Sequence, residues 1–292
     1  MTRIGIVGTG MLGEAVGLHL LESGYDLTVH NRTKEKTEKL AEKGASVVDT
    51  PKQVGENSDL IITVVKDANA VNDVIFGENG IILGEHQGMC IADMSTVNPN
   101  FTKEISQKVN SYNVDFLEIP VMGGPNVAID GKLVMMASGK KEIFEKFKNV
   151  FDKISEQSFY LGDSGTAHSI KLVMNLQIAM IALALSEGIT LTRKAGFDPE
   201  VFLKILNSTY FKTGMSENKA YKMINDSFNP TFTLANLKKD LDTINDTADS
   251  FDVELPMAQN ARKIYEQAID AGLGDIDYTG ILAYIKELSS KK

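Results

Sequence analysis

Three glycines near the start of the chain have a spacing that suits dinucleotide binding. Gly8, Gly10 and Gly13 form the pattern G-x-G-x-x-G, directly after a β-branched run over residues 3–7 and at the start of a helical pattern. There the first glycine permits a tight turn, the second lets the backbone approach a pyrophosphate, and the third lets helix and strand pack closely. The phosphates then lie at the amino end of a helix, which favours anions. We predict a cofactor loop made of Gly8, Thr9, Gly10, Met11, Leu12 and Gly13; the alternative is a glycine-rich turn without a ligand.

The residues after the second expected strand indicate which dinucleotide is preferred. NAD sites usually place a carboxylate there to accept hydrogen bonds from the ribose. This chain has Asn31, Arg32 and Thr33 instead, followed by Lys36. A guanidinium pairs well with a 2′-phosphate, so we predict that these residues bind NADP (NADPH) in preference to NAD. The alternative for Arg32 is a solvated surface charge.

A further cofactor contact is expected after the strand over residues 60–65. Val65, Lys66 and Asp67 follow it, and such loops usually run beneath the adenosine-side ribose. Asp67 has an equally good alternative, because a carboxylate at this position can cap the next helix.

Two other strand ends predict the substrate side, since ligands of open α/β sheets bind beyond the carboxyl ends of the strands. Ser95 and Thr96 follow one of these strands and are expected to cap the next helix or, for Thr96, to reach the nicotinamide ribose. Gly123 and Gly124 follow another, and their backbone N–H groups suit a carboxylate. An ordinary turn is the alternative there.

Lys171 and Asn175 are four residues apart in a helical pattern, so they share one helix face. A lysine can donate a proton to a developing alkoxide, and an amide can orient a substrate. Taken alone, the spacing is weak evidence, because most lysines on helices are solvated surface residues. Phe232, Lys239 and Asp240 are by themselves ordinary core or surface residues of the second half.

The elements that position these residues differ between the two halves of the chain. Up to about residue 160, short strands alternate with helical patterns, which predicts a parallel sheet with right-handed crossovers. From residue 166 to residue 195 the apolar period is helical, and no strand is expected beyond it. We predict a Rossmann-type doubly wound α/β domain over residues 1–163 and an all-α domain over residues 164–292, joined by a long interdomain helix.

Composition excludes several classes of protein. The 292 residues are 43% hydrophobic and 24% charged, with a formal net charge of −9, so neither nucleic acid nor an anionic membrane surface is expected as a partner. A single cysteine, Cys90, and four scattered histidines predict no disulfide framework and no metal site. The longest apolar run, residues 172–185, is shorter than the roughly 20 residues that a membrane span needs. No signal peptide is seen, and we expect a cytoplasmic protein.

Five segments in this order resemble the β-hydroxyacid dehydrogenase family, which includes 3-hydroxyisobutyrate dehydrogenases and glyoxylate/succinic semialdehyde reductases. The resemblance covers essentially the whole chain and rests on the following residues: Gly8–Gly13, Asp93–Thr96, Pro120–Gly124, the set Gly162, Gly165, Lys171 and Asn175, and the pair Lys239 and Asp240.

The resemblance implies a role for each matched residue. Lys171 would be the general acid/base, with Asn175 holding both substrate and lysine. Thr96, Gly123 and Gly124 would line the carboxylate pocket. From the helical half, Phe232 and Asp240 would approach the substrate and the nicotinamide, and Lys239 would contact the cofactor or close the cleft. The family also implies a homodimer or homotetramer.

Two positions depart from the family pattern. Met122 stands where many members have a serine whose hydroxyl contacts the substrate carboxylate, and Leu176 stands where many have a second asparagine. Met122 remains a predicted substrate contact, but it makes the pocket more apolar.

The resulting prediction is an NADPH-preferring oxidoreductase that interconverts a small carboxylate-bearing aldehyde, of the semialdehyde or glyoxylate class, and its hydroxy acid. An imine reductase of the same fold is one alternative, although such enzymes commonly replace the lysine with Asp or Tyr. A non-catalytic NADP-binding scaffold is the other.

Overall fold

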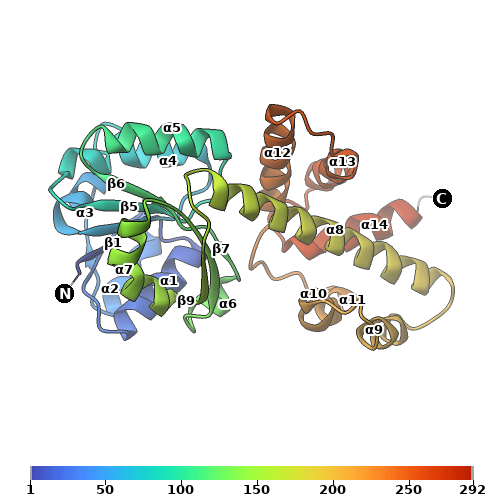
Figure 1. The fold of residues 1–292 in the computed structure, drawn as a ribbon. Helices are drawn as coiled ribbons and strands as arrows, with labels where there is room; N and C mark the ends of the chain where they lie inside the picture. The colour runs from blue at the N-terminus through green and yellow to red at the C-terminus, as the bar shows by residue number, and fades with distance from the viewer. Residues whose placement is uncertain (1, 291–292) are drawn as a thin grey trace. The chain divides into compact units, whose positions relative to one another are not determined.

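The computed structural model describes residues 2–290, which divide into two compact units, the first ending at Leu172 and the second beginning at Val173. The first unit contains a nine-stranded sheet in the order β3-β2-β1-β4-β5-β6-β8-β7, with β9 beside β8 (Figure 1). Its strands are β1 (Ile4–Val7), β2 (Leu27–His30), β3 (Ser46–Val47), β4 (Leu60–Thr63), β5 (Cys90–Asp93), β6 (Asp115–Glu118), β7 (Val121–Met122), β8 (Leu133–Gly139) and β9 (Ser155–Tyr160). Its helices are α1 (Met11–Glu22), α2 (Glu38–Glu42), α3 (Pro51–Asn57), α4 (Ala68–Phe76), α5 (Pro99–Asn110), α6 (Pro125–Ala128) and α7 (Lys141–Ile154).

The central strands are apolar on both sides because helices cover both faces of the sheet. Ile4 and Ile6 of β1 point into one core with α1 and α7, whereas Ile61 of β4 and Ile91 of β5 point into a second core with α4 and α5. All four are at most 1% exposed. Figure 1 shows α4 and α5 on one face and α1 and α7 on the other. This is the arrangement expected of a parallel sheet, and the doubly wound prediction is confirmed.

The strands from β3 to β6 are all parallel, so their carboxyl ends meet at one edge of the sheet. The expectation of a parallel sheet fails beyond β6, because β8 pairs antiparallel with both β6 and β7. The reason is the length of the connections: β7 and β8 are joined through the four-residue α6 and a turn, which is too short for a parallel crossover.

The second unit is helical, and no strand occurs among its described residues, as predicted. It contains most of α8 (Thr166–Lys194), followed by α9 (Pro199–Asn207), α10 (Gly214–Asn218), α11 (Ala220–Ile224), α12 (Leu234–Ser250), α13 (Pro256–Asp270) and α14 (Ile281–Ser290). Leu185 and Ile189 of α8 pack in its core against Leu203, Met223 and Leu282. The predicted boundary at residue 163 stays a prediction.

Within residues 2–290, α8 is the one helix that is long and apolar enough to span a membrane by length and composition. Its best 18-residue window has a mean hydropathy of 1.7, and 44% of that window is buried inside the protein. The core helix of a helical unit meets the same criterion, and Leu185 and Ile189 lie in such a core. The absence of a membrane partner stays a prediction.

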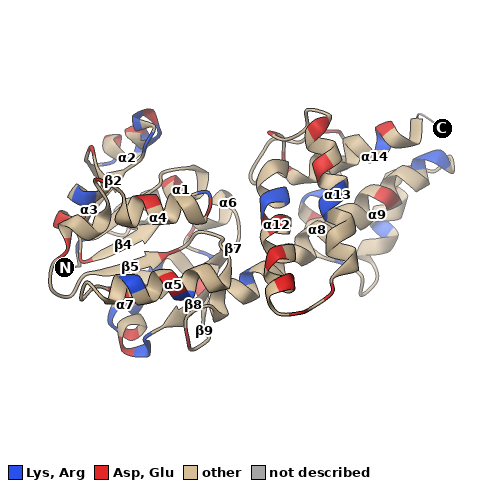
Figure 2. Ribbon diagram, turned by 90° about the horizontal axis from the view of Figure 1, so that it is seen from above, with Lys and Arg blue, Asp and Glu red and all other residues tan. Residues whose placement is uncertain are grey.

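Two helical segments of the first unit differ from what the sequence pattern predicts. The sequence over residues 33–43 is typical of one amphipathic helix, whereas the structure has a 3₁₀ turn, Lys34–Thr37, followed by the short α2. The helix α7 was not predicted, although Phe144, Phe147 and Phe151 lie on its buried face. Figure 2 shows acidic and basic residues interspersed over the helices of both units, in agreement with the mixed charge of the sequence.

Candidate active site

The glycine loop follows β1 directly and opens α1. Gly8 has a φ of +102°, and a Cβ there would overlap the carbonyl oxygen of Val64. A Cβ on Gly13 would overlap the carbonyl oxygen of Gly8, so helix and strand pack as closely as expected. A Cβ on Gly10 would meet nothing within 4 Å, and no side chain caps the amino end of α1. The loop therefore leaves backbone N–H groups open at a helix start, which is the geometry that a pyrophosphate needs.

Asn31 connects this loop to the end of β2. Its Oδ1 accepts a hydrogen bond from Thr9 N at 3.0 Å, and its Nδ2 donates to Thr33 O at 2.8 Å. The Thr9 hydroxyl is buried and has no hydrogen-bond partner among the described residues. Asn31 thus fixes two predicted cofactor segments relative to each other. The hydroxyl of Thr9 retains an unused hydrogen-bonding capacity beside them.

The basic residues after β2 are not equivalent. Lys34 pairs with Asp49 at 2.9 Å and Lys39 pairs with Glu14 at 2.7 Å. Arg32 and Lys36 are exposed and form no ion pair within the part of the chain that the structure describes. The charges of Arg32 and Lys36 are therefore not neutralised by a carboxylate among the described residues, unlike those of Lys34 and Lys39.

The loop after β4 packs on the loop after β5. Asp67 caps α4 by accepting a hydrogen bond from Ala70 N at 2.9 Å, so the capping alternative is confirmed. Ser95 is 3% exposed, and its Oγ accepts a hydrogen bond from Val65 N at 3.1 Å. The expectation that Ser95 or Thr96 caps the next helix is wrong, because Asn98 is the N-cap of α5 and accepts from Asn100 N. Ser95 instead holds the two loops together.

Lys171 reaches the segment over residues 119–124, which contains the two-residue strand β7 and which we call the loop after β6. Its Nζ donates to the carbonyl oxygen of Val121 at 2.7 Å and to Met122 Sδ at 3.3 Å. In the same loop, Gly123 has a φ of +114°, and a Cβ on Gly124 would meet nothing within 4 Å. The structure therefore brings Lys171, the predicted acid/base, close to Met122, which differs from the family pattern, and to the glycines that are predicted to bind the carboxylate.

In the second unit, Asn175 and Asp240 are both 2% exposed and contact each other. Asn175 Nδ2 donates to Asp240 Oδ2 at 2.6 Å, and Lys239 Nζ lies 2.6 Å from Asp240 Oδ1. The amide oxygen of Asn175 is buried without a hydrogen-bond partner among the described residues. Asn175, Asp240 and Lys239 are thus connected by successive polar contacts, and Asn175 Oδ1 remains an unused hydrogen-bond acceptor.

Phe232 is half-buried, and its position is fixed by neighbouring residues of the second unit. Its ring packs edge-on against Tyr278, with ring centroids 5.9 Å apart, and its carbonyl oxygen accepts from Tyr278 N at 3.0 Å. Lys219 pairs with Asp277 at 2.9 Å and lies over the Tyr278 ring. This arrangement gives Phe232 a defined position, and its contact with a substrate stays a prediction.

The sequence reasoning missed a buried polar cluster around His168. His168 is 0% exposed and lies beside Glu118, Asp93 and Thr102, which are also buried. The signal that could have found it is its place three residues before Lys171, on the same face of α8.

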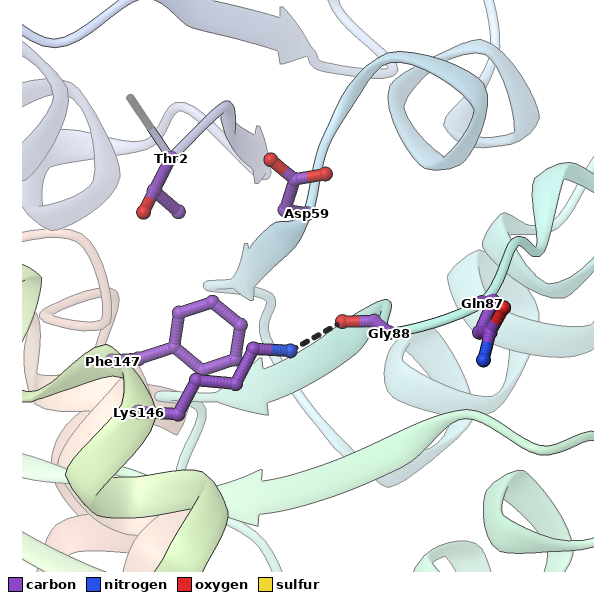
Figure 3. A pocket seen from close by; sticks show the side chains of 6 residues that line it. All are labelled: Thr2, Asp59, Gln87, Gly88, Lys146 and Phe147. Atoms are coloured by element: carbon purple, nitrogen blue, oxygen red, sulfur yellow. Dashed lines mark hydrogen bonds between the residues drawn. The ribbon is translucent and has the colours of Figure 1, made fainter.

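A hollow of about 440 Å³ lies at the opposite edge of the sheet, where the strands begin (Figure 3). Figure 3 shows Lys146 donating to Gly88 O, at 2.9 Å, beside Phe147, with Asp59 across the hollow. Asp59 is already paired with Arg3 at 2.7 Å. None of the predicted site residues lines this hollow.

Comparison with known proteins agrees with these observations. Residues 3–162 match the NAD binding domain of 6-phosphogluconate dehydrogenase, and residues 165–285 match the family described as NAD-binding of NADP-dependent 3-hydroxyisobutyrate dehydrogenase. The chain is 32% identical to glyoxylate/succinic semialdehyde reductase 1 of Arabidopsis thaliana, over 97% of this chain and 98% of that protein.

Two further comparisons place the chain among proteins of different roles. It is 32% identical to the cytokine-like nuclear factor N-PAC of Xenopus tropicalis, over 97% of this chain but only 53% of that longer protein. The crystal structure of 3-hydroxyisobutyrate dehydrogenase from Salmonella typhimurium superimposes with a TM-score of 0.89, at 24% identity, over 97% of this chain and all of that one. The fold is thus shared with this enzyme structure.

Proposed function

Since this chain belongs to the β-hydroxyacid dehydrogenase family of NAD(P)-dependent oxidoreductases, we propose that it reduces a small carboxylate-bearing aldehyde to the hydroxy acid with NADPH. The observation that carries the proposal is the contact of Lys171 Nζ with Val121 and Met122, beside the open backbone of Gly124. A proton donor and a candidate anion-binding loop are thereby adjacent.

Lys171 supplies the proton in this proposal. Its two named acceptors, a carbonyl oxygen and a thioether, are both neutral, so neither removes its proton. When an aldehyde oxygen replaces one of these contacts, the ammonium donates a hydrogen bond to it and then a proton as negative charge develops. In the reverse direction the neutral amine accepts the proton of the hydroxyl group.

The residues around the glycine loop fit a nicotinamide dinucleotide. Gly10 leaves space for the pyrophosphate, the start of α1 offers its N–H groups, and the Thr9 hydroxyl lacks a partner. We assign Arg32 and Lys36 to the 2′-phosphate, which favours NADPH over NADH, because their charges are not paired within residues 2–290. When bound, the cofactor supplies or accepts the hydride.

Met122 narrows the range of carboxylate-bearing aldehydes that we propose as substrates. Its thioether occupies the position from which many relatives offer a serine hydroxyl, so the carboxylate relies on the backbone N–H groups of Gly123 and Gly124. The methionine side chain is well suited to pack against methylene groups. We therefore favour a semialdehyde with a short carbon chain, such as succinic semialdehyde, over glyoxylate. The similarity of the chain to a glyoxylate/succinic semialdehyde reductase of Arabidopsis thaliana supports this class of substrate.

A panel of substrates tests the proposal. The loss of NADPH absorbance would be followed with succinic semialdehyde, methylmalonate semialdehyde, tartronate semialdehyde, glyoxylate and a cyclic imine, each also with NADH. We expect turnover of a semialdehyde and a preference for NADPH. Activity on the imine alone would favour an imine reductase. Tight NADPH binding with no turnover would favour a non-catalytic role and contradict the proposal.

A further inference from the structure

His168 is a fully buried titratable group that the proposed reaction does not use. It lies in the first turn of α8, and its side chain is completely excluded from solvent. Two carboxylates, Glu118 and Asp93, are buried beside it, at 0% and 1% exposure. Burying three ionisable groups together is costly unless they are paired and hydrogen-bonded, so the pairing within this cluster determines its charge.

The partners of the ring determine where its protons are. The Nε2 atom lies 2.9 Å from Ser95 O, a carbonyl oxygen that only accepts, so Nε2 carries a proton. The Nδ1 atom lies 3.2 Å from Glu118 Oε2 and 2.9 Å from Thr102 Oγ1. The Thr102 hydroxyl donates its own proton to Asn98 O, at 3.2 Å, and therefore accepts from the ring. Both ring nitrogens thus face acceptors.

Glu118 is held as a carboxylate by the start of α8. Its Oε2 accepts from the backbone N–H of His168 at 3.1 Å, and its Oε1 accepts from the backbone N–H of Gly165. Asp93 Oδ1 accepts from Thr63 Oγ1 at 2.7 Å and from Ser95 N at 3.2 Å. Its Oδ2 has no hydrogen bond among the described residues and lies 3.9 Å from His168 Nε2. Each carboxylate is thus placed to be balanced by a positive ring.

The ring connects the three segments that carry the proposed site. Through Ser95 O it holds the loop after β5, which continues into Thr96. Through Glu118 it is tied to the end of β6, three residues before Val121, the carbonyl of which accepts from Lys171. Its own backbone is one helical turn before Lys171. A change in the ring therefore affects both Lys171 and the residues that Lys171 contacts.

We propose that His168 is a buried imidazolium and a positioning residue, which sets Lys171 against the loop after β6 and against Thr96. The positioning half of this inference rests on the proposed function, whereas the charge state does not. His168 touches no reacting atom in this proposal, and its effect on the reaction passes through Lys171.

The charge balance around the ring supports this assignment. Burial opposes the charged ring, but the hydrogen bond and charge of Glu118, together with the charge of Asp93, outweigh it and raise the pKa of His168. Burial likewise opposes ionisation of Glu118, and His168 outweighs it and lowers the carboxyl pKa. The charged or titratable groups around the ring are Glu118 on β6, Asp93 on β5 and Lys171 one turn further along α8; α5 contributes the neutral Thr102.

Nitrogen NMR of the full chain with labelled histidine tests the charge state without any turnover. The signals would be assigned by comparing the wild type with His168→Gln and His86→Gln. We expect both ring nitrogens of His168 to keep the imidazolium pattern at about pH 8, well above the ordinary histidine pKa of about 6.5. A neutral pattern for His168 at that pH would overturn the inference.

Kinetics tests the positioning role with the same variants. Per folded molecule and at saturating NADPH, His168→Gln should lower kcat for the best semialdehyde about 10- to 100-fold, since a small misplacement of a catalytic group costs up to about 100-fold. The NADPH Kd should stay within about twofold, and His86→Gln should keep wild-type kcat. Adding Glu118→Gln to His168→Gln removes the uncompensated carboxylate and should restore thermal stability without restoring kcat.

The outcomes separate the two proposals. Wild-type kcat in folded His168→Gln, or full recovery of kcat in the double variant, would show a merely structural role and overturn the positioning claim. If the wild type reduces no substrate of the panel, the proposed function fails, while the NMR result still decides the charge state of His168.

Discussion

The two edges of the sheet in the first unit differ in what they offer a ligand. At the edge where the strands begin, a hollow of about 440 Å³ has two charged groups in its lining, and both already have partners: Lys146 bonds to Gly88 O, and Asp59 pairs with Arg3. At the edge where the strands end, the start of α1 is uncapped, the space at Gly10 is open and Arg32 has no paired charge within residues 2–290. A hollow is therefore a poorer guide to function here than unused hydrogen-bonding capacity.

The largest effect should come from Lys171. Lys171→Ala removes the proton donor, so kcat for a semialdehyde should fall by about 10²- to 10⁴-fold while NADPH affinity stays nearly unchanged. The matched control is Lys146→Ala, which removes a lysine from the opposite edge and should leave kcat at the wild-type value. Steady-state kinetics and NADPH titration measure both. Wild-type kcat in Lys171→Ala, or loss of NADPH binding, would show that the assigned role is wrong.

Arg32 should decide between the two dinucleotides. Arg32→Ala removes a charge-assisted contact to the 2′-phosphate, which is worth roughly 10- to 100-fold in NADPH Kd, and should leave NADH affinity unchanged. Lys34→Ala is the control, because Lys34 is exposed and already paired with Asp49. Titration of each variant with NADPH and NADH measures the preference. Equal loss of both cofactors would place Arg32 outside the phosphate site.

A substitution at Gly10 tests whether this glycine is required by the fold or by the bound cofactor. Its φ of −70° and ψ of −174° suit any residue, and a Cβ would meet no protein atom within 4 Å. Gly10→Ala should therefore keep the thermal stability of the wild type and raise the NADPH Kd by about tenfold, the cost of about one hydrogen bond to a charged group. Gly214→Ala, at another open glycine, should change neither quantity. An unchanged Kd in Gly10→Ala would mean that the pyrophosphate lies elsewhere.

The smallest effect concerns the pH dependence of stability. A raised pKa of His168 adds stability that is fully present below the unfolded value of about 6.5 and is lost as the pH rises through the folded pKa. The lowered pKa of Glu118 adds stability that is present above its unfolded value of about 4.5 and is lost as the pH falls through the folded pKa. The gap in unfolding free energy between wild type and His168→Gln should therefore shrink as the pH rises.

Denaturant unfolding at several pH values measures this gap. It should change by about 1.4 kcal/mol for each unit by which the pKa of His168 is raised. A gap that stays constant or widens with increasing pH would contradict the buried ion pair.

Sequence patterns predicted the parts of the fold that depend on local rules. The glycine loop, the parallel strands of the first unit and the helical second unit were predicted because close approach, burial and helical period leave direct marks on residue types. The antiparallel β8 was not foreseen, because strand direction depends on the length of the connections rather than on the composition of the strand. The cluster of His168, Glu118 and Asp93 joins residues up to 75 positions apart, so the spacing to Lys171 could point to the histidine but not to its two carboxylates.

The candidate site was predicted unevenly for the same reason. Asn31 was assigned to the cofactor, but its contact with Thr9 shows that it also shapes the loop. Ser95 was expected at the substrate or as a helix cap, and its hydroxyl instead accepts from Val65 N. Side chains that connect loops are visible only after the loops meet at the edge of the sheet.

The most direct test of the central claim compares succinic semialdehyde with butanal, which has the same carbon chain and no carboxylate. NADPH oxidation by the purified full chain would be measured with each aldehyde. We predict a kcat/KM at least about 10- to 100-fold higher for succinic semialdehyde, the worth of a charge-assisted carboxylate contact. Equal kcat/KM for the two aldehydes, or no oxidation with either, would contradict a semialdehyde reductase built on Lys171 and the loop after β6.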